Sequence, residues 1–183
     1  MTAPSAPDSD PRSTKPNPPQ YRIGHGYDLH RLEPIAPAGD GRPLIIGGIR
    51  LDHDRGPVAR SDGDALLHAV TDAILGACAL PDIGELFPDT DEAHENQDSA
   101  QFLAAALQAA AEAGYIPSNL DATVILERPK LKPIKLAIRE NLAELLGVGL
   151  DRANVKGKTH ERVDAVGEGR AIEVHAVVMM VRL

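Results

Sequence analysis

Asp28 and His30 are metal-binding residue types that stand two positions apart in residues 21–30, a segment that the sequence predicts to be extended. Side chains at i and i+2 of a strand point to the same side, roughly 7 Å apart, so both can converge on one ion. His68 lies in an apolar, periodic segment typical of a helix, whose face can present it to the same ion. Two imidazoles and one carboxylate leave a fourth position open, as in a catalytic zinc site. Taken alone each motif is weak, since a helical histidine more often serves packing or solvation.

The helix that carries His68 is predicted to begin within the sequence Ser-Asp-Gly-Asp. Ser61 is the expected N-cap, and Asp64 completes a capping box three residues later. The helix should continue to about residue 79, before Pro81. An apolar stripe at i, i+4 and i+8 should face the core: Leu66, Val70 and Ile74.

Glycines flank these candidate ligands at four positions: Gly24, Gly26, Gly63 and Gly84. One interpretation is conformational, because glycine permits tight turns and close packing. The other is functional, because a backbone without side chains can approach a phosphate group closely. The sequence alone leaves both interpretations open.

The remaining pattern predicts a single domain, which suits a chain of 183 residues. Gly47 and Gly48 mark a hairpin between residues 44–46 and 49–51. Residues 81–95 read as a loop, 99–113 and 133–146 as helices, and 120–126, 155–161 and 171–183 as strands. We therefore expect an α+β sandwich in which a mostly antiparallel or mixed β-sheet carries helices on one face. Residues 176–181 are apolar at every position, which predicts that both faces of this strand are buried, one against another subunit.

Composition excludes several classes of protein. The net charge is -8 with no basic stripe, which argues against a nucleic-acid partner. No stretch approaches the roughly 20 apolar residues of a membrane span. Cys78 is the single cysteine, so no disulfide can form within the chain, and a reducing, cytoplasmic location is expected. Residues 1–20 contain six prolines and read as a disordered tail before a domain of residues 21–183.

Several ordered motifs together carry a family resemblance. They are Arg-Ile-Gly-His-Gly-Tyr-Asp-Leu-His at 22–30, Ser-Asp-Gly-Asp-Ala-Leu-Leu-His at 61–68, Asp-Ile-Gly-Glu-Leu-Phe-Pro-Asp-Thr-Asp at 82–91 and Asn-Val-Lys at 154–156. With these motifs the sequence resembles the 2-C-methyl-D-erythritol 2,4-cyclodiphosphate synthase family, from about residue 21 to the last residue.

The resemblance implies a reaction, an assembly and two kinds of metal ion. The substrate would be 4-diphosphocytidyl-2-C-methyl-D-erythritol 2-phosphate, whose 2-phosphate attacks the β-phosphorus and expels CMP in non-mevalonate isoprenoid synthesis. Such an enzyme is a cyclising phosphorus–oxygen lyase. It would be a homotrimer with active sites at the subunit interfaces. Zinc would bind Asp28, His30 and His68, and a Mg²⁺ or Mn²⁺ ion at Glu161 would bridge the substrate diphosphate.

The resemblance also implies roles for individual residues. Arg60 and Thr159 match positions that contact phosphate during catalysis. Residues 82–84 match the erythritol-binding positions, and residues 126–132 match the cytosine-binding segment. The residues expected to bind substrate are Asp28, Leu29, His30, Arg60, Ser61, Asp82, Ile83, Gly84, Phe87, Pro88, Asp89, Thr90, Asp91, Leu126, Pro129, Lys130, Leu131, Lys132, Lys158, Thr159, His160 and Glu161.

The sequence departs from the family pattern at several positions. Arg60 stands where the family usually has His. It directly precedes the expected N-cap, where helix-end amides favour anions, so we expect it to take over the phosphate contact. Glu168 and Arg170 reverse the usual order of Arg and Glu, and they are expected to pair near the trimer axis. Two other functions remain open: a ligand-binding homologue without turnover, and a zinc hydrolase of another phosphodiester, which would need a general base.

Overall fold

The computed structural model describes residues 17–88 and 95–183. The predicted disordered tail therefore lies mostly outside the described residues, as do the expected substrate-binding residues Asp89, Thr90 and Asp91. The elements follow in the order β1 (Tyr21–Pro34), β2 (Ile45–Ile46), β3 (Ile49–Arg50), β4 (Arg55–Pro57), α1 (Ala65–Ala77), α2 (Ile83–Leu86), α3 (Ser99–Glu112), β5 (Tyr115–Ile125), α4 (Lys135–Leu146), η2 (Leu150–Arg152), β6 (Ala153–Lys158), α5 (Asp164–Gly167) and β7 (Ala171–Arg182).

Five strands form one sheet in the order β4-β1-β7-β5-β6. β1 pairs antiparallel with β4 and β7, and β5 pairs antiparallel with β7 but parallel with β6. The mostly antiparallel, mixed sheet predicted from the sequence is thus confirmed. The long ladder between β1 and β7 sets Asp28 opposite Val174 and His30 opposite Ile172. The separate hairpin of β2 and β3 confirms the turn predicted at Gly47 and Gly48.

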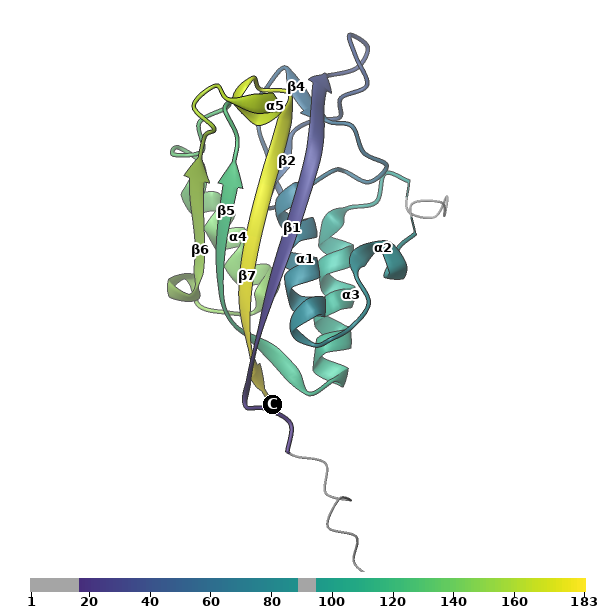
Figure 1. The fold of residues 1–183 in the computed structure, drawn as a ribbon, viewed down its shortest axis with the longest axis vertical. Helices are drawn as coiled ribbons and strands as arrows, with labels where there is room; N and C mark the ends of the chain where they lie inside the picture. Colours follow the sequence, from purple (N-terminus) through teal and green to yellow (C-terminus); the bar gives the residue numbers. More distant parts are fainter. Residues whose placement is uncertain (1–16, 89–94) are drawn as a thin grey trace, which may run out of the picture.

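Helices α1, α3 and α4 cover one face of this sheet (Figure 1). The central helix is α1, which packs on β1 and β7 and against α3. Its predicted apolar stripe is fully buried, and so are Leu67 and Leu75 on other sides of the helix. A helix buried around most of its circumference belongs to the core, so its position is fixed by packing from several directions.

Gly24 and Gly26 allow α1 to approach β1 closely. A Cβ at Gly24 would lie 1.7 Å from the carbonyl oxygen of Ala73, and one at Gly26 would lie 1.8 Å from that of Ala69. These separations are far inside van der Waals contact, so a larger residue would push the helix away from the strand. The packing interpretation of these two glycines is confirmed.

The opposite face of the sheet carries no helix of the described part of the chain. Along β7, Ala176, Val178 and Met180 are buried, whereas Val177 is 42% exposed. Within one chain only the helix-covered face of this strand is buried, so the expectation that its other face is buried against another subunit stays a prediction. The large apolar side chains on the open face of β1 and β7 include Tyr21, Ile23, Tyr27, Leu29 and Val177.

The N-cap of α1 is Asp64 rather than Ser61. The Asp64 carboxylate accepts hydrogen bonds from two N–H groups of the first turn at 3.0 Å and from Gly47 and Gly48 at 2.9 and 2.6 Å. Four donors compensate for burying a carboxylate, whereas a serine hydroxyl could accept at most two. Ser61 Oγ instead accepts from the N–H of Gly63, at 3.1 Å.

Other element ends also differ from the sequence-based expectation. The predicted loop at residues 81–95 contains α2, because Asp82 caps it by accepting from the N–H of Glu85 at 2.9 Å. Strand β6 ends at Lys158, three residues early, because Glu161 has φ of +51° and cannot continue a strand. The helix expected from residue 133 begins at Lys135.

Candidate active site

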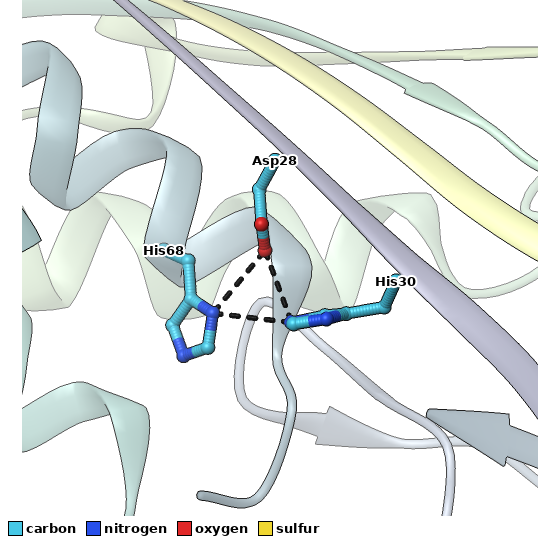
Figure 2. A group of neighbouring side chains, drawn as sticks. All are labelled: Asp28, His30 and His68. Atoms are coloured by element: carbon cyan, nitrogen blue, oxygen red, sulfur yellow. Dashed lines mark hydrogen bonds and ion pairs between the residues drawn. The ribbon is translucent and has the colours of Figure 1, made fainter. Parts of the chain in front are cut away.

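Asp28, His30 and His68 bring three ligand atoms together (Figure 2). Asp28 Oδ2 lies 3.1 Å from His30 Nε2 and 3.2 Å from His68 Nδ1, and the two nitrogens are 3.2 Å apart. Ligands about 2.0–2.1 Å from a tetrahedral zinc ion would stand roughly 3.3 Å from one another. The donor types and the size of this triangle therefore fit a zinc ion with its fourth position open, and the three predicted ligands do converge.

Strand alternation and the close approach of α1 position these ligands. Asp28 and His30 point from β1 toward α1, while Leu29 between them is 50% exposed on the opposite face. The Leu29 side chain therefore does not share the ligand cluster, although it was expected to bind substrate. Its N–H donates to Asp28 Oδ1 at 3.0 Å, which directs Oδ2 toward the two imidazoles.

The electrostatics of the cluster favour a cation. Burial raises the pKa of Asp28, but hydrogen bonds from His30 and His68 outweigh it and hold the pKa well below its usual range. Burial lowers the pKa of His68, yet the hydrogen bond and charge of Asp28, with the charges of Asp64 and Asp62, raise it overall. The cluster thus attracts positive charge, which a proton or a metal ion can supply.

A cavity of about 530 Å³ opens beside the triangle. Many of the expected substrate-binding residues line it together: His30, Arg60, Ser61, Ile83, Gly84 and Phe87, with the ligand His68. The sequence analysis missed three lining residues, of which Phe102 forms an apolar wall with Phe87 at a ring separation of 4.7 Å. Asp72 on α1 holds α2 at the cavity by accepting from the N–H of Ile83 at 2.9 Å.

Arg60 is exposed and lines this cavity, but it does not directly precede the N-cap of α1 as expected. Because Asp64 is the N-cap, Arg60 lies four residues before it, and the Asp64 side chain already occupies the first amides of α1. The helix-end anion site expected beside Arg60 therefore does not form.

Burial raises the pKa of Asp64 to about 6, although hydrogen bonds from Gly48, Gly47 and Leu67 lower it.

A second cavity, of about 550 Å³, lies beside β5 and β6. In the sheet, β7 lies between these two strands and β1, which carries two of the candidate ligands. Four lysines gather at the second cavity on a chain of net negative charge, an arrangement suited to a phosphorylated ligand. Lys135 and Gly157 were missed in the sequence analysis. The expected residues that line the cavity are Leu126, Lys130, Leu131, Lys132, Lys158, Thr159 and Glu161. Glu161 and the two histidines of the candidate metal site thus line different cavities of one chain.

The turn after β6 has an unusual backbone. Glu161, Arg162 and Asp164 have φ of +51°, +70° and +61°, which is uncommon for residues with a Cβ. His160 Nδ1 lies 2.8 Å from Asp164 Oδ2 and links the two ends of the turn. Backbone strain of this kind clusters at functional sites, which agrees with the expected role of residues 159–161.

Two further groups of expected residues lie outside these cavity walls. Glu168 and Arg170 pair within one chain, since Arg170 Nε donates to Glu168 Oε2 at 2.7 Å. This contact lies within one chain, so the expected pairing near a trimer axis stays a prediction. Asp82, the N-cap of α2, and Pro129, which follows a cis peptide bond, stand next to cavity-lining residues in the sequence.

The fold and the site define an α+β domain with an Asp-His-His group that could hold a metal ion at one cavity and a lysine-rich second cavity. The chain belongs to the YgbB family, which matches residues 21–181.

Named relatives support the activity expected from the sequence. The chloroplastic 2-C-methyl-D-erythritol 2,4-cyclodiphosphate synthase of Oryza sativa subsp. japonica is 54% identical over 91% of this chain and 73% of its own length. The synthase of Dechloromonas aromatica (strain RCB) is 48% identical over 89% of this chain and 98% of its own length. The expected family is thereby confirmed, and the names of these relatives support the expected activity.

A solved structure shows the same fold. The CDP-bound form of a 2C-methyl-D-erythritol-2,4-cyclodiphosphate synthase has a TM-score of 0.77 and 38% identity, over 87% of this chain and 99% of that one.

No described helix has the length and apolar character needed to cross a membrane. Since the rice relative is named chloroplastic, the expected cytoplasmic location stays a prediction.

Proposed function

We propose that this chain converts 4-diphosphocytidyl-2-C-methyl-D-erythritol 2-phosphate to 2-C-methyl-D-erythritol 2,4-cyclodiphosphate and CMP. The observation that carries the proposal is the ligand triangle of Asp28, His30 and His68, whose two histidines line a cavity, in a member of this family. An oxygen of the 2-phosphate forms a bond to the β-phosphorus, and the bond from that phosphorus to CMP breaks. No water is consumed, which separates this lyase from a hydrolase.

The chemistry requires positioning and charge neutralisation more than proton transfer, because two phosphate groups must meet. A zinc ion held by Asp28, His30 and His68 would supply Lewis acidity toward phosphate oxygens. Arg60 adds a permanent cation to the same cavity, and the lysines of the second cavity neutralise the nucleotide phosphates. Thr159 has a hydroxyl there that can donate to a phosphate oxygen.

A homotrimer would bring the two cavities into one active site. One chain separates the zinc triangle from the lysine-rich cavity, whereas the substrate carries its phosphates and its cytidine on one molecule. The apolar open face of the sheet supports self-association, since large exposed apolar patches mark interfaces. Light scattering should report a trimer, and a fully active monomer would contradict a shared site.

A second divalent ion, Mg²⁺ or Mn²⁺, is proposed at Glu161. The Glu161 carboxylate stands among the lysines of the second cavity, where oxygen ligands from the protein and from a diphosphate could bind a hard cation together. Activity should depend on added Mg²⁺ or Mn²⁺ even when zinc is fully bound, and Glu161→Gln should remove that dependence along with turnover.

A phosphorus NMR assay with the diphosphocytidyl substrate tests the activity directly. The expected result is a cyclic diphosphate and CMP, with no ¹⁸O incorporated from labelled water. Incorporation of ¹⁸O would indicate the zinc hydrolase instead. Tight binding of CDP without turnover would indicate the ligand-binding homologue.

A further inference from the structure

The nitrogen of His68 that faces away from the ligand triangle has its own partners. His68 Nε2 lies 2.9 Å from Ser99 Oγ and 3.3 Å from Ser61 Oγ. Ser99 is the first residue of α3 and is fully buried, so its hydroxyl has little access to water. The shorter of the two distances marks Ser99 as the main partner of this imidazole.

The direction of the hydrogen bond follows from the partner of Ser99. The Asp62 carboxylate receives the Ser99 hydroxyl in a short hydrogen bond, and its Oδ2 accepts from the Ser99 N–H at 3.1 Å. An ionised carboxylate can only accept, so the Ser99 hydroxyl proton points to Asp62. The Ser99 oxygen then has only lone pairs for His68 Nε2, which must carry the proton. When this imidazole is neutral, as a metal ligand must be, its other nitrogen, Nδ1, carries the lone pair and faces Asp28 and His30.

We propose that Ser99 and Asp62 are positioning residues, which hold His68 in the tautomer and orientation that ligates the metal through Nδ1. The proposal rests on the metal site of the proposed function. A carboxylate or other polar partner on the outer nitrogen of a ligating histidine is a recurrent feature of metal sites and typically contributes about 10- to 100-fold to metal affinity. The hydrogen bonds between Asp62 and Ser99 also connect the loop before α1 to the start of α3, so the packing of α3 affects the metal site.

The test compares two variants that each lose one buried hydroxyl. Ser99→Ala removes the partner of His68 Nε2. Thr71→Val is the matched control, since Thr71 lies on the same helix as His68 and its hydroxyl donates only to the carbonyl of Leu67 among the described contacts, at 2.8 Å. Zinc affinity is measured on the purified full-length chain by competition with a chromophoric chelator. We expect Ser99→Ala to bind zinc about 10- to 100-fold more weakly and Thr71→Val to match the unaltered chain.

A second measurement does not depend on any variant of Ser99 or Asp62 folding. Nitrogen-15 NMR of the metal-free chain, at a pH where His68 is neutral, should show the Nε2–H tautomer for the resonance that is lost in His68→Ala. An Nδ1–H tautomer, or equal zinc affinity in Ser99→Ala and the unaltered chain, would overturn the proposal. Failure of the unaltered chain to bind zinc would instead overturn the metal site itself.

Discussion

Two histidine pairs lie on opposite faces of the same sheet, and β1 contributes one member to each. The covered pair, His30 and His68, faces the helices and has its Nε2 and Nδ1 atoms 3.2 Å apart. The open pair, His25 and His175, lies on the other face with the same two kinds of nitrogen 3.1 Å apart. The spacing of the imidazoles is therefore the same in a candidate metal site and in a pair that lies outside it.

The pairs differ in where the carboxylate stands. In the covered pair, Asp28 Oδ2 lies within 3.2 Å of both facing nitrogens. In the open pair, Glu173 Oε1 lies 3.0 Å from the outer nitrogen, Nε2 of His175. That nitrogen must donate to Glu173, so His175 Nδ1 accepts from His25 and the pair forms a hydrogen-bonded chain. Position of the carboxylate, rather than the number of histidines, distinguishes a site for a cation from a structural hydrogen-bond relay.

The largest effect is expected from removing one histidine from each pair. His68→Ala should lower bound zinc from about one per chain to near none and abolish turnover, because one of three protein ligands is lost. His25→Ala should keep about one zinc per chain, since the open pair supplies no ligand. Metal content by mass spectrometry after dialysis decides the matter. Loss of zinc in His25→Ala, or full occupancy in His68→Ala, would break the comparison.

A smaller effect is expected from a substitution that moves α1 away from β1. This movement would change the geometry of the covered pair but not of the open pair. Gly26→Ala places a Cβ against the backbone of Ala69 and should cost about 1–3 kcal/mol of unfolding free energy while weakening zinc binding. Gly76→Ala is the control on the same helix, because a Cβ there meets nothing within 4 Å. That substitution should stabilise by about 0.5–1 kcal/mol. Denaturant unfolding of both variants measures the difference, and equal stabilities would argue against tight helix–strand contact.

The pH dependence of zinc binding should be the mildest of these effects. The pKa of His68 is raised, so protons begin to compete with zinc for His68 at a pH above 6.5. As the pH falls further, this competition should lower the zinc affinity by roughly tenfold per pH unit. Without metal the sign reverses for His68, whose contribution to stability is present below pH 6.5 and is lost as pH rises through its raised pKa. Asp28 contributes above its ordinary pKa of 3.8 and loses this as pH falls. Titration calorimetry should give the same pH profile of zinc affinity for His25→Ala as for the unaltered chain. An altered pH profile would indicate that the two histidine pairs are coupled.

Short-range spacing made all three candidate metal ligands predictable. Asp28 and His30 need only the period of a strand to share a face, and His68 needs only a helix that packs on it. Ser99 and Asp62 could not be predicted, because their contact with His68 depends on how α3 docks against α1. The sequence pattern also could not separate Ser61 from Asp64 as the N-cap, since both suit that position and the choice depends on the distant hairpin amides.

Fold class was predictable from the same kind of local signal, whereas the surroundings of each element were not. The apolar run in β7 does show which strand is central, but burial of its second face requires atoms that one chain does not supply. Glu161 was expected in a strand because its neighbours favour one, and its left-handed backbone is set by the following turn.

The shared use of β1 limits how this segment can change in evolution. Only two residues separate His25 from Asp28, and each side chain keeps its face through strict alternation. A one-residue insertion or deletion between them would move every later side chain of the strand to the other face, so that Leu29 would face the helices in place of the candidate metal ligands. The number of residues between His25 and Asp28 therefore has to stay constant in any chain that keeps both histidine pairs.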